Sequence, residues 1–422
     1  MNFGPVVGID VSKRFSDMCI LSPDNQIFAQ TKIYHDSTSM KRAEALLKKA
    51  TEAFGGRPAV VMEATSHYHL ILFQFFSDCG YDVLVVNPLQ SSSMKDFSIR
   101  KRKTDKVDAL KLAMLYRTKT LRPSQIPQSA IRALRLLCRE RVELLNDVTR
   151  YKNRLTAFLD QIFPGYDKVF SDVGSITSRA VLSHFPTPAI LLASDEYELV
   201  EVIATASKSG YKFAKKKAEA LIKTAETAKV LGIHTCADES MILSIIPMLN
   251  TLSDSVTYLE QSIGNLLAQV KTVRKNVELL QTIPGVGPHS ASLIMAEIGD
   301  ISLFKKPKQL AAYFGLDPSE RQSGTFRGTK NKLSKRGSPY ARAALHMAVV
   351  NAVFRHANAP AANPVLSGYY ENKCKTKPAK VALAASMHKL IFIIFAVLRD
   401  QKPFELRTPE QHAREQGFIK AA

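Results

Sequence analysis

Cysteine is scarce in this chain of 422 residues, and its five cysteines lie far apart in the sequence. No two of them form a Cys-x-x-Cys pair, which excludes a cysteine-rich zinc site. The same spacing excludes a secreted disulfide framework and favours a reducing compartment, so we expect a cytoplasmic protein. The N-terminus runs directly into a strand-like segment, so no signal peptide is expected.

A long uninterrupted apolar segment is also missing. The longest apolar stretch covers residues 381–398, and His388 and Lys389 interrupt it. We expect a segment this short and broken to form a buried helix rather than to span a bilayer. No membrane partner is therefore expected.

Acidic residues are outnumbered, with 38 Asp and Glu against 58 Lys and Arg, which gives a formal charge of +20. This excess indicates a polyanionic partner, of which nucleic acid is the leading candidate. Anionic membrane is the weaker candidate, because the basic residues are spread over several segments. An acidic cytosolic enzyme that acts on a neutral metabolite is disfavoured. The 45% of hydrophobic residues is typical of a globular chain, and the length suggests two to four domains.

The hydrophobic patterns predict an α/β fold followed by a mostly α-helical remainder. Residues 1–120 alternate strand and helix signals, which predicts a mixed-sheet domain. Residues 121–282 are predicted to be a helical coiled-coil region, and residues 283–405 a helical C-terminal domain. Residues 406–422 are expected to be a polar tail.

The coiled-coil signal is a strict alternation of three and four residues from Ile245 to Leu280. Its first core positions are mostly β-branched and its second core positions mostly Leu, which favours a parallel two-stranded coiled coil and hence a homodimer. The alternative is an antiparallel hairpin within one chain, with residues 134–162 as the partner helix. Between the two helices we expect a helical insert at about 165–240, whose Lys212 and Lys215–Lys217 are expected to form a solvated basic face.

Four carboxylates stand where chemistry is expected. Asp10 and Glu63 each end an apolar strand, and such positions commonly face a ligand crevice. Asp105 and Asp108 are three residues apart at the start of a predicted helix and share a face. Clustered carboxylates repel one another unless a cation lies among them, and Mg²⁺ or Mn²⁺ suits their hard oxygen ligands. Each acid alone also has an ordinary structural explanation: Asp105 could begin a helix, and Asp10 could begin a turn.

The surroundings of these acids are basic. Residues that would attract a phosphate backbone lie just before Asp105, namely Arg100, Lys101, Arg102 and Lys103. Acids within a basic frame suit a site where two metal ions act on a phosphodiester.

Taken together, the motifs resemble those of a known family. They are Gly8-Ile9-Asp10, Glu63-Ala64-Thr65, Thr104-Asp105-Lys106-Val107-Asp108-Ala109, Ile283-Pro284-Gly285-Val286-Gly287, Phe314-Gly315-Leu316, Ser323-Gly324 and Arg327-Gly328. The chain resembles the DEDD transposases, which include the Piv-type invertases and the bridge-RNA-guided insertion-sequence recombinases. The likeness covers most of the chain except the insert near 165–240. One departure is Ser66, where the family usually has Gly.

The resemblance implies a fold, a mechanism and partners. The N-terminal domain would have an RNase H-like (RuvC-like) fold, in which Asp10, Glu63, Asp105 and Asp108 hold Mg²⁺. Ser323 would attack the DNA phosphate and form a phosphoserine intermediate. The partners would be target and donor DNA, a non-coding bridge RNA, and further copies of the chain in a dimer or tetramer, in the prokaryotic cytosol or nucleoid. The residues expected near phosphate are Arg327, Lys330, Lys332, Lys335 and Arg336.

Other interpretations of the same residues stay open. A metal-dependent junction-resolving nuclease would use the four acids and water, with Ser323 incidental. An actin-like ATPase or sugar kinase would explain Gly8-Ile9-Asp10, although the net charge disfavours it, and a non-catalytic nucleic-acid scaffold would explain the charge alone. The Gly285 turn resembles a helix-hairpin-helix that binds phosphate, or else it is a tight connection between two helices.

Overall fold

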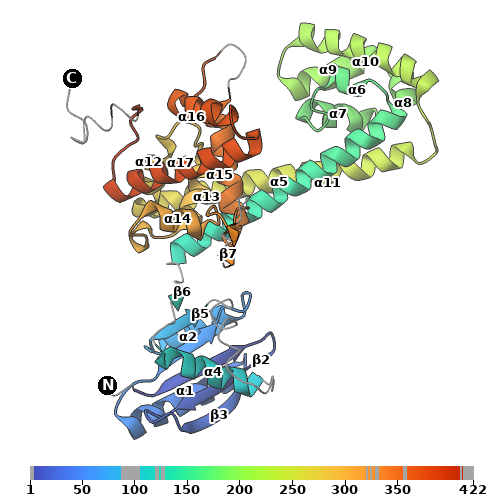
Figure 1. Cartoon of the computed structure of the whole chain (residues 1–422). Coiled ribbons are helices and arrows are strands. Elements are labelled where there is room, and N and C mark those ends of the chain that lie inside the picture. Colours follow the sequence, from blue (N-terminus) through green and yellow to red (C-terminus); the bar gives the residue numbers. More distant parts are fainter. Residues whose placement is uncertain are drawn as a thin grey trace. The chain divides into compact units, whose positions relative to one another are not determined.

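The computed structural model describes residues 4–86, 105–118, 123–124, 129–319, 322–323, 326–327, 332–354, 359–408 and 411. The chain divides into two compact units, Met1–Ile126 and Pro127–Ala422 (Figure 1). The first unit ends close to the predicted boundary at residue 120. The second contains both the central helices and the C-terminal helices.

The N-terminal unit is built on a mixed sheet, as the alternating strand and helix signals predicted. Its strands are β1 (Val6–Val11), β2 (Phe15–Leu21), β3 (Ile27–Tyr34), β4 (Ala59–Glu63), β5 (Val83–Val86) and β6 (Pro123–Ser124), in the order β3-β2-β1-β4-β5-β6. The first three strands form an antiparallel meander, and β4 and β5 run parallel to β1. Strand β6 closes the sheet antiparallel to β5.

Side chains alternate between the two faces of this sheet, and each face has its own helices. Val7 and Ile9 pack with α1 (Ser37–Phe54) and α2 (His69–Asp78) in one core cluster. Val6 and Val61 pack with Ala109 of α4 (Asp105–Arg117) in another. Because successive side chains of a strand point to opposite faces, the position of each acid along its strand decides whether it lies on the α4 side of the sheet.

The second unit contains a long antiparallel helical hairpin. Its two arms are α5 (Ser129–Ile162) and α11 (Asp238–Gln269), which pack against each other. The end of α5 shares a core with the start of α11, through Leu159 and Ile245. The start of α5 shares a core with the end of α11, through Leu134 and Ile263. The apolar stripe of α11 is therefore buried within one chain, which is the second of the two arrangements that the periodicity left open.

The stripe is also not one continuous helix. At Val270 the backbone leaves the helical region, with φ −115° and ψ 85°, and α12 (Lys271–Gln281) begins at the next residue. A heptad pattern records which side chains are apolar, but it does not record a break of one residue between two helices.

The insert between the two arms is a small helical bundle. It consists of α6 (Tyr166–Val169), α7 (Ile176–His184), α8 (Pro188–Ala193), α9 (Glu196–Ser207) and α10 (Tyr211–Leu231). The fully buried Tyr166 lies at its centre, where its hydroxyl is 3.0 Å from Ser178 Oγ. A helical insert was predicted here.

The remaining helices pack around the base of the hairpin. They are α13 (Pro288–Ile298), the 3₁₀ helix η2 (Ile301–Leu303), α14 (Pro307–Tyr313), α15 (Pro339–Val353), α16 (Pro364–Cys374) and α17 (Ala379–Asp400), with the short strands β7 (Gln322–Ser323) and β8 (Phe326–Arg327). On α5, Arg139 holds the buried Glu297 of α13 through two hydrogen bonds of 2.7 and 2.9 Å.

Helix α17 is the apolar segment identified in the sequence. Contrary to the expectation that it is too short, its length and mean hydropathy of 2.2 would suffice to cross a bilayer. Half of that segment is buried, and Leu390, Ile391 and Ile394 lie in the core with no exposed surface. It is a core helix of this unit, as predicted.

Candidate functional site

Asp10 lies near the end of β1, in the middle of the sheet. It is half-buried, and its neighbour two residues earlier on the same face is Gly8. Strand β1 pairs in parallel with β4, with Ile9 opposite Met62, so Glu63 at the end of β4 lies one step beyond that pair, beside Asp10. The structure thus places two of the predicted ligands on neighbouring strands and on one face.

Helix α4 covers that face at unusually short range. A Cβ on Gly8 would lie 2.0 Å from the carbonyl oxygen of Ala109 and 2.7 Å from the backbone nitrogen of Ala113. Only glycine permits this approach. The glycine before Asp10 therefore fixes the height of α4 above β1, and with it the position of the acids on α4.

Asp108 is on α4 and is only 8% exposed. Its Oδ1 is 3.3 Å from the Lys111 ammonium one turn further along the helix. Asp105 is the first residue of α4, but its side chain is outside the described part of the structure. The acids on α4 thus sit next to the Gly8 contact, at the side of the sheet on which Asp10 and Glu63 lie.

A further acid on this face escaped the sequence analysis. Asp17 on β2 is directly opposite Asp10 in the antiparallel pair and is 3% exposed. It shares its face with Cys19 and Leu21, which pack against α4. Asp17 lies two residues before Cys19 and four before Leu21, which are both buried. This alternation is the sequence signal that could have identified Asp17. Like charges directly opposite each other in a sheet are unfavourable, so this pair adds to the demand for a cation.

The donor set suits a divalent cation of the Mg²⁺ or Mn²⁺ type, because it consists of carboxylate oxygens. Among the side chains that the structure describes, no three potential ligands converge into a preformed metal cluster. Asp105 is outside that comparison. The fit therefore rests on the chemistry of the acids and on the face they share.

Ser66 follows this site and occupies the position where the family usually has Gly. Its φ is 49°, in the left-handed region that glycine favours. Ser66 thus adopts, at this turn after Glu63, a backbone conformation that glycine adopts readily.

Ser323 ends β7 and pairs with Phe326 of β8, which forms a short hairpin. The base of the hairpin is clamped by hydrogen bonds: Ser319 N donates to the Lys332 carbonyl at 2.7 Å, and Lys335 N donates to the Gly315 carbonyl at 3.0 Å. Side chains between residues 320 and 331 are outside the described part. The structure thus assigns Ser323 a backbone position but no side-chain contacts.

The predicted phosphate contacts fall into two groups. Lys332, Lys335 and Arg336 are exposed and line the returning arm of the hairpin base. Arg327 lies on β8 opposite Gln322, but its side chain is not described. The remaining predicted contacts lie outside the described residues, namely Arg100, Lys101, Arg102, Lys103 and Lys330.

The turn at Gly285 joins α12 to α13. Gly285 has φ 96°, and a Cβ there would lie 2.5 Å from the Ala348 carbonyl oxygen of α15. Ile283 and Val286 on either side are buried in the core. These contacts explain this glycine by packing alone, which favours the tight helix connection over a phosphate-binding turn.

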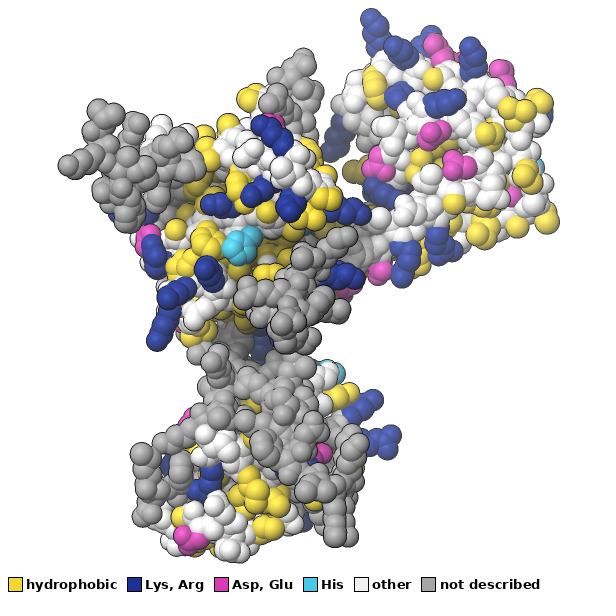
Figure 2. All heavy atoms as spheres, viewed as in Figure 1, with side chains coloured by type: hydrophobic (Ala, Val, Ile, Leu, Met, Phe, Trp, Pro, Cys, Tyr) yellow, Lys and Arg dark blue, Asp and Glu magenta, His cyan; other side chains and the backbone are white. Residues whose placement is uncertain are grey.

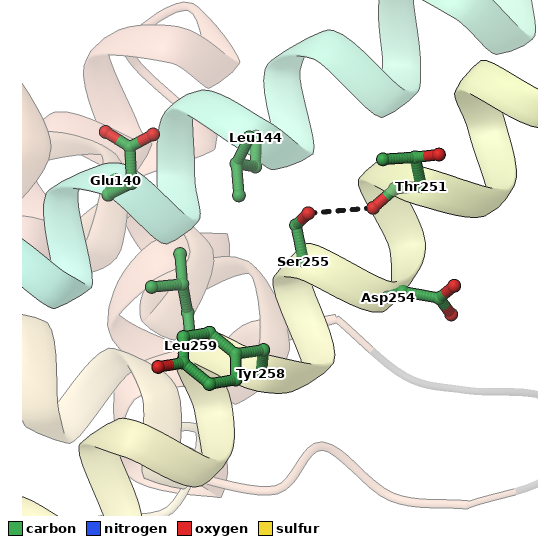
Figure 3. A pocket seen from close by; sticks show the side chains of 7 residues that line it. All are labelled: Glu140, Leu144, Thr251, Asp254, Ser255, Tyr258 and Leu259. Atoms are coloured by element: carbon green, nitrogen blue, oxygen red, sulfur yellow. Dashed lines mark hydrogen bonds between the residues drawn. The ribbon is translucent and has the colours of Figure 1, made fainter.

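A hollow also lies along the α5–α11 hairpin (Figure 3). It is lined by Glu140, Leu144, Thr251, Asp254, Ser255, Tyr258 and Leu259, and Ser255 Oγ donates 2.8 Å to the Thr251 carbonyl. Figure 3 shows the Glu140 and Asp254 carboxylates pointing away from each other. This arrangement offers no paired acids for chemistry.

Comparison with known proteins gives a consistent class. One transposase family model, of the DEDD IS110 type, matches residues 7–164, and a second, described as transposase IS116/IS110/IS902 family, matches residues 277–371. These matches cover both the carboxylate-bearing sheet and the Ser323 hairpin. Both matched regions are similar to transposases.

Full-length and partial relatives agree with this class. The chain is 24% identical over 96% of its length to the insertion element IS110 uncharacterized 43.6 kDa protein of Streptomyces coelicolor, of which the match also covers 96%. It is 35% identical to the pilin gene-inverting protein of Moraxella bovis over 37% of this chain and 48% of that one. Among solved structures, Thermus thermophilus RuvC in complex with a Holliday junction substrate matches 29% of this chain and all of that one, at 13% identity and a TM-score of 0.22. The chain belongs to the IS110-type transposase family.

Proposed function

We propose that this chain is a DNA recombinase that moves or inverts DNA by transesterification. The observation that carries the proposal is that Asp10, Glu63 and Asp108 belong to the α4 side of one sheet, where Gly8 lets the helix approach β1. The match of a DEDD transposase model to this region supports it. The strand order of the sheet is compatible with the RNase H-like fold expected there.

Asp10, Glu63, Asp105 and Asp108 would hold Mg²⁺ or Mn²⁺, which supplies charge neutralisation at the scissile phosphate. Strand register fixes the backbone positions of Asp10 and Glu63 on one face of the sheet, which supports this role. Lys332, Lys335 and Arg336 follow the hairpin and would hold the phosphate backbone near Ser323.

Ser323 would be the nucleophile. Its Oγ loses a proton and attacks the phosphorus, the bond to the leaving DNA oxygen breaks, and a phosphoserine ester with one DNA end remains. A hydroxyl of a second strand then attacks this ester, releases Ser323 and restores a phosphodiester. Each step exchanges one phosphoester bond for another, so the sequence of steps needs no ATP.

Specificity would come from a non-coding bridge RNA that pairs with target and donor DNA, and the protein would read backbone and shape. The charge of +20 supports binding of two polyanions at once. Copies of the chain would associate as a dimer or tetramer in the prokaryotic cytosol. Since the stripe of α11 is used within the chain, such an assembly would use outer positions of the hairpin such as Leu136 and Tyr258, which are 65% and 69% exposed.

The test is adduct formation by Ser323→Ala, Asp10→Asn and Ser244→Ala. Ser244 is exposed on α11 and its hydroxyl donates to the Met241 carbonyl of the same helix, which makes it a serine control outside the Ser323 hairpin. With labelled element-end DNA and Mg²⁺, wild type and Ser244→Ala should give a protein–DNA adduct on a denaturing gel, whereas the other two should not. Cleavage that persists in Ser323→Ala would instead identify a water-dependent nuclease. Sequencing the RNA that co-purifies tests guidance: one discrete RNA encoded beside the gene supports it, and only bulk RNA contradicts it.

A further inference from the structure

A basic surface on the C-terminal helices is not explained by the proposed catalytic machinery. Between Pro364 and Leu398 the sequence contains five lysines and one acid, Glu371. The lysines are Lys373 at the end of α16, Lys375 and Lys377 in the turn, and Lys380 and Lys389 on α17; all five are exposed. Figure 2 shows Lys and Arg side chains gathered over these helices.

Two of these lysines converge on one aromatic ring. The ammonium groups of Lys373 and Lys389 lie 5.5 and 5.6 Å from the ring centroid of Tyr369. Both distances are in the range of cation–π attraction. Tyr369 thus attracts two positive charges that come from different helices.

The positive field extends to a third helix. Burial lowers the pKa of His388, and the neighbouring Lys389 of α17 and Lys308 of α14 lower that pKa further. Both α14 and α16 pack against α17. Lysines from three elements therefore face one region.

Among the described side chains, the five lysines of α16 and α17 have no acidic partner. Holding like charges together costs free energy unless a polyanion neutralises them. A surface with this arrangement suits a chain of phosphates better than a single anion.

A lipid surface fits less well. A helix that lies on a membrane inserts an apolar face beneath its basic one. The apolar residues of α17, such as Leu390 and Ile394, are already buried in the core. Of the large apolar side chains that the structure describes on α17, Val381 alone is exposed, which is little for insertion into a bilayer.

We propose, on the basis of the proposed function as a DNA recombinase, that Lys373, Lys375, Lys377, Lys380 and Lys389, with Tyr369 as their organising ring, form a docking surface for the phosphodiester backbone of duplex DNA. We call it the α16–α17 surface. It shares no residue with the carboxylates of the N-terminal sheet or with the Ser323 hairpin, and it would hold DNA whether or not cleavage occurs.

The test is binding by the full chain in EDTA, so that neither metal chemistry nor cleavage enters. The first variant is Lys373→Gln with Lys377→Gln and Lys389→Gln. The matched control is Lys215→Gln with Lys216→Gln and Lys229→Gln on α10, which are also exposed and lower the charge of +20 by the same three units. Circular dichroism and melting temperature check that both variants fold like wild type.

Affinity for a labelled DNA duplex and for an RNA hairpin is measured against salt. Each lysine that contacts a B-DNA phosphate contributes about 0.9 to the slope of log K on log salt. The first variant should lose about 2 to 3 in that slope and on the order of tenfold in affinity at low salt, while the control stays near wild type. The loss should be larger for the DNA duplex than for the RNA hairpin.

Three results would overturn the proposal. The first is an equal loss in both variants, which would mean that only total charge matters. The second is no loss in the first variant. The third is unchanged nucleic-acid binding together with lost binding to vesicles of phosphatidylserine and phosphatidylcholine, which would identify a lipid surface.

Discussion

Gly8→Ala is the substitution that most directly tests the candidate site. The new Cβ would lie 2.0 Å from the Ala109 carbonyl oxygen, whereas ordinary contact begins near 3.4 Å. Helix α4 would have to rise by about 1.4 Å locally, because the obstructing atoms are backbone and cannot rotate away. Overpacking of this kind typically costs about 1–3 kcal/mol.

The shift would also separate Asp108 from Asp10 and Glu63, so the functional loss should exceed the stability loss. A displacement near 1 Å at a catalytic site is enough to reduce a rate by about a hundredfold. We expect Gly8→Ala to fold, to melt several degrees lower, and to lose Mg²⁺-dependent adduct formation. Hydrogen exchange should quicken in α4 and β1.

Gly56→Ala is the matched control, since a Cβ there has nothing within 4 Å. Melting temperature, amide exchange and adduct formation are compared for both variants at the same protein concentration. If Gly8→Ala is as stable and as active as Gly56→Ala, then α4 does not set the position of the acids, and the argument fails.

Three further predictions concern other parts of the chain. Arg139→Met should lower the free energy of unfolding by about 3 kcal/mol, because the Glu297 carboxylate is 3% exposed and would lose its partner. In urea titrations, changing both Arg139 and Glu297 to Met should recover much of the lost free energy. No recovery would contradict the ion-pair argument. Burial raises the pKa of Cys138 to about 12, so its thiol stays protonated at pH 8. Cys138 should therefore resist a thiol reagent that labels the exposed Cys236, which mass spectrometry of the native protein can check. Equal labelling of both cysteines would show that the core around Cys138 opens. Ser66→Gly should raise stability by up to ~1 kcal/mol in thermal melts, because the left-handed φ of 49° costs less for glycine, and a lowered melting temperature would refute this.

The N-terminal sheet could be predicted from the sequence because strand signals and burial agree there. Val6 to Val11 are apolar on both faces except near Asp10, and the strand indeed lies in the middle of the sheet. Asp17 escaped prediction because the apolar run of this strand, Met18 to Leu21, begins only after it. The strand begins earlier, at Phe15, and period two then places Asp17 on the buried face.

The α5–α11 hairpin shows what hydrophobic periodicity can predict and what it cannot. The apolar spacing from Ile245 to Ile263 correctly marks the buried side of α11. A buried stripe accepts any partner of matching shape, however, and does not state its direction or its chain. The pairing of α11 with α5 is a tertiary contact, and one end of both arms shares a core with the insert around Tyr166.

The charge pattern separates the proposed metal ligands from the basic surfaces of the second unit. The acids that would hold metal belong to unit Met1–Ile126, while the basic hairpin base and the α16–α17 surface belong to unit Pro127–Ala422. Nucleic acid held by the second unit would not need the metal. Loss of metal or of Asp10 should therefore stop cleavage while binding persists, and neutralising the α16–α17 surface should weaken binding while leaving the carboxylate site of the sheet intact. If cleavage and binding can be lost separately, the metal ligands and the binding surface are distinct sites. If they are always lost together, a single charged site performs both cleavage and binding.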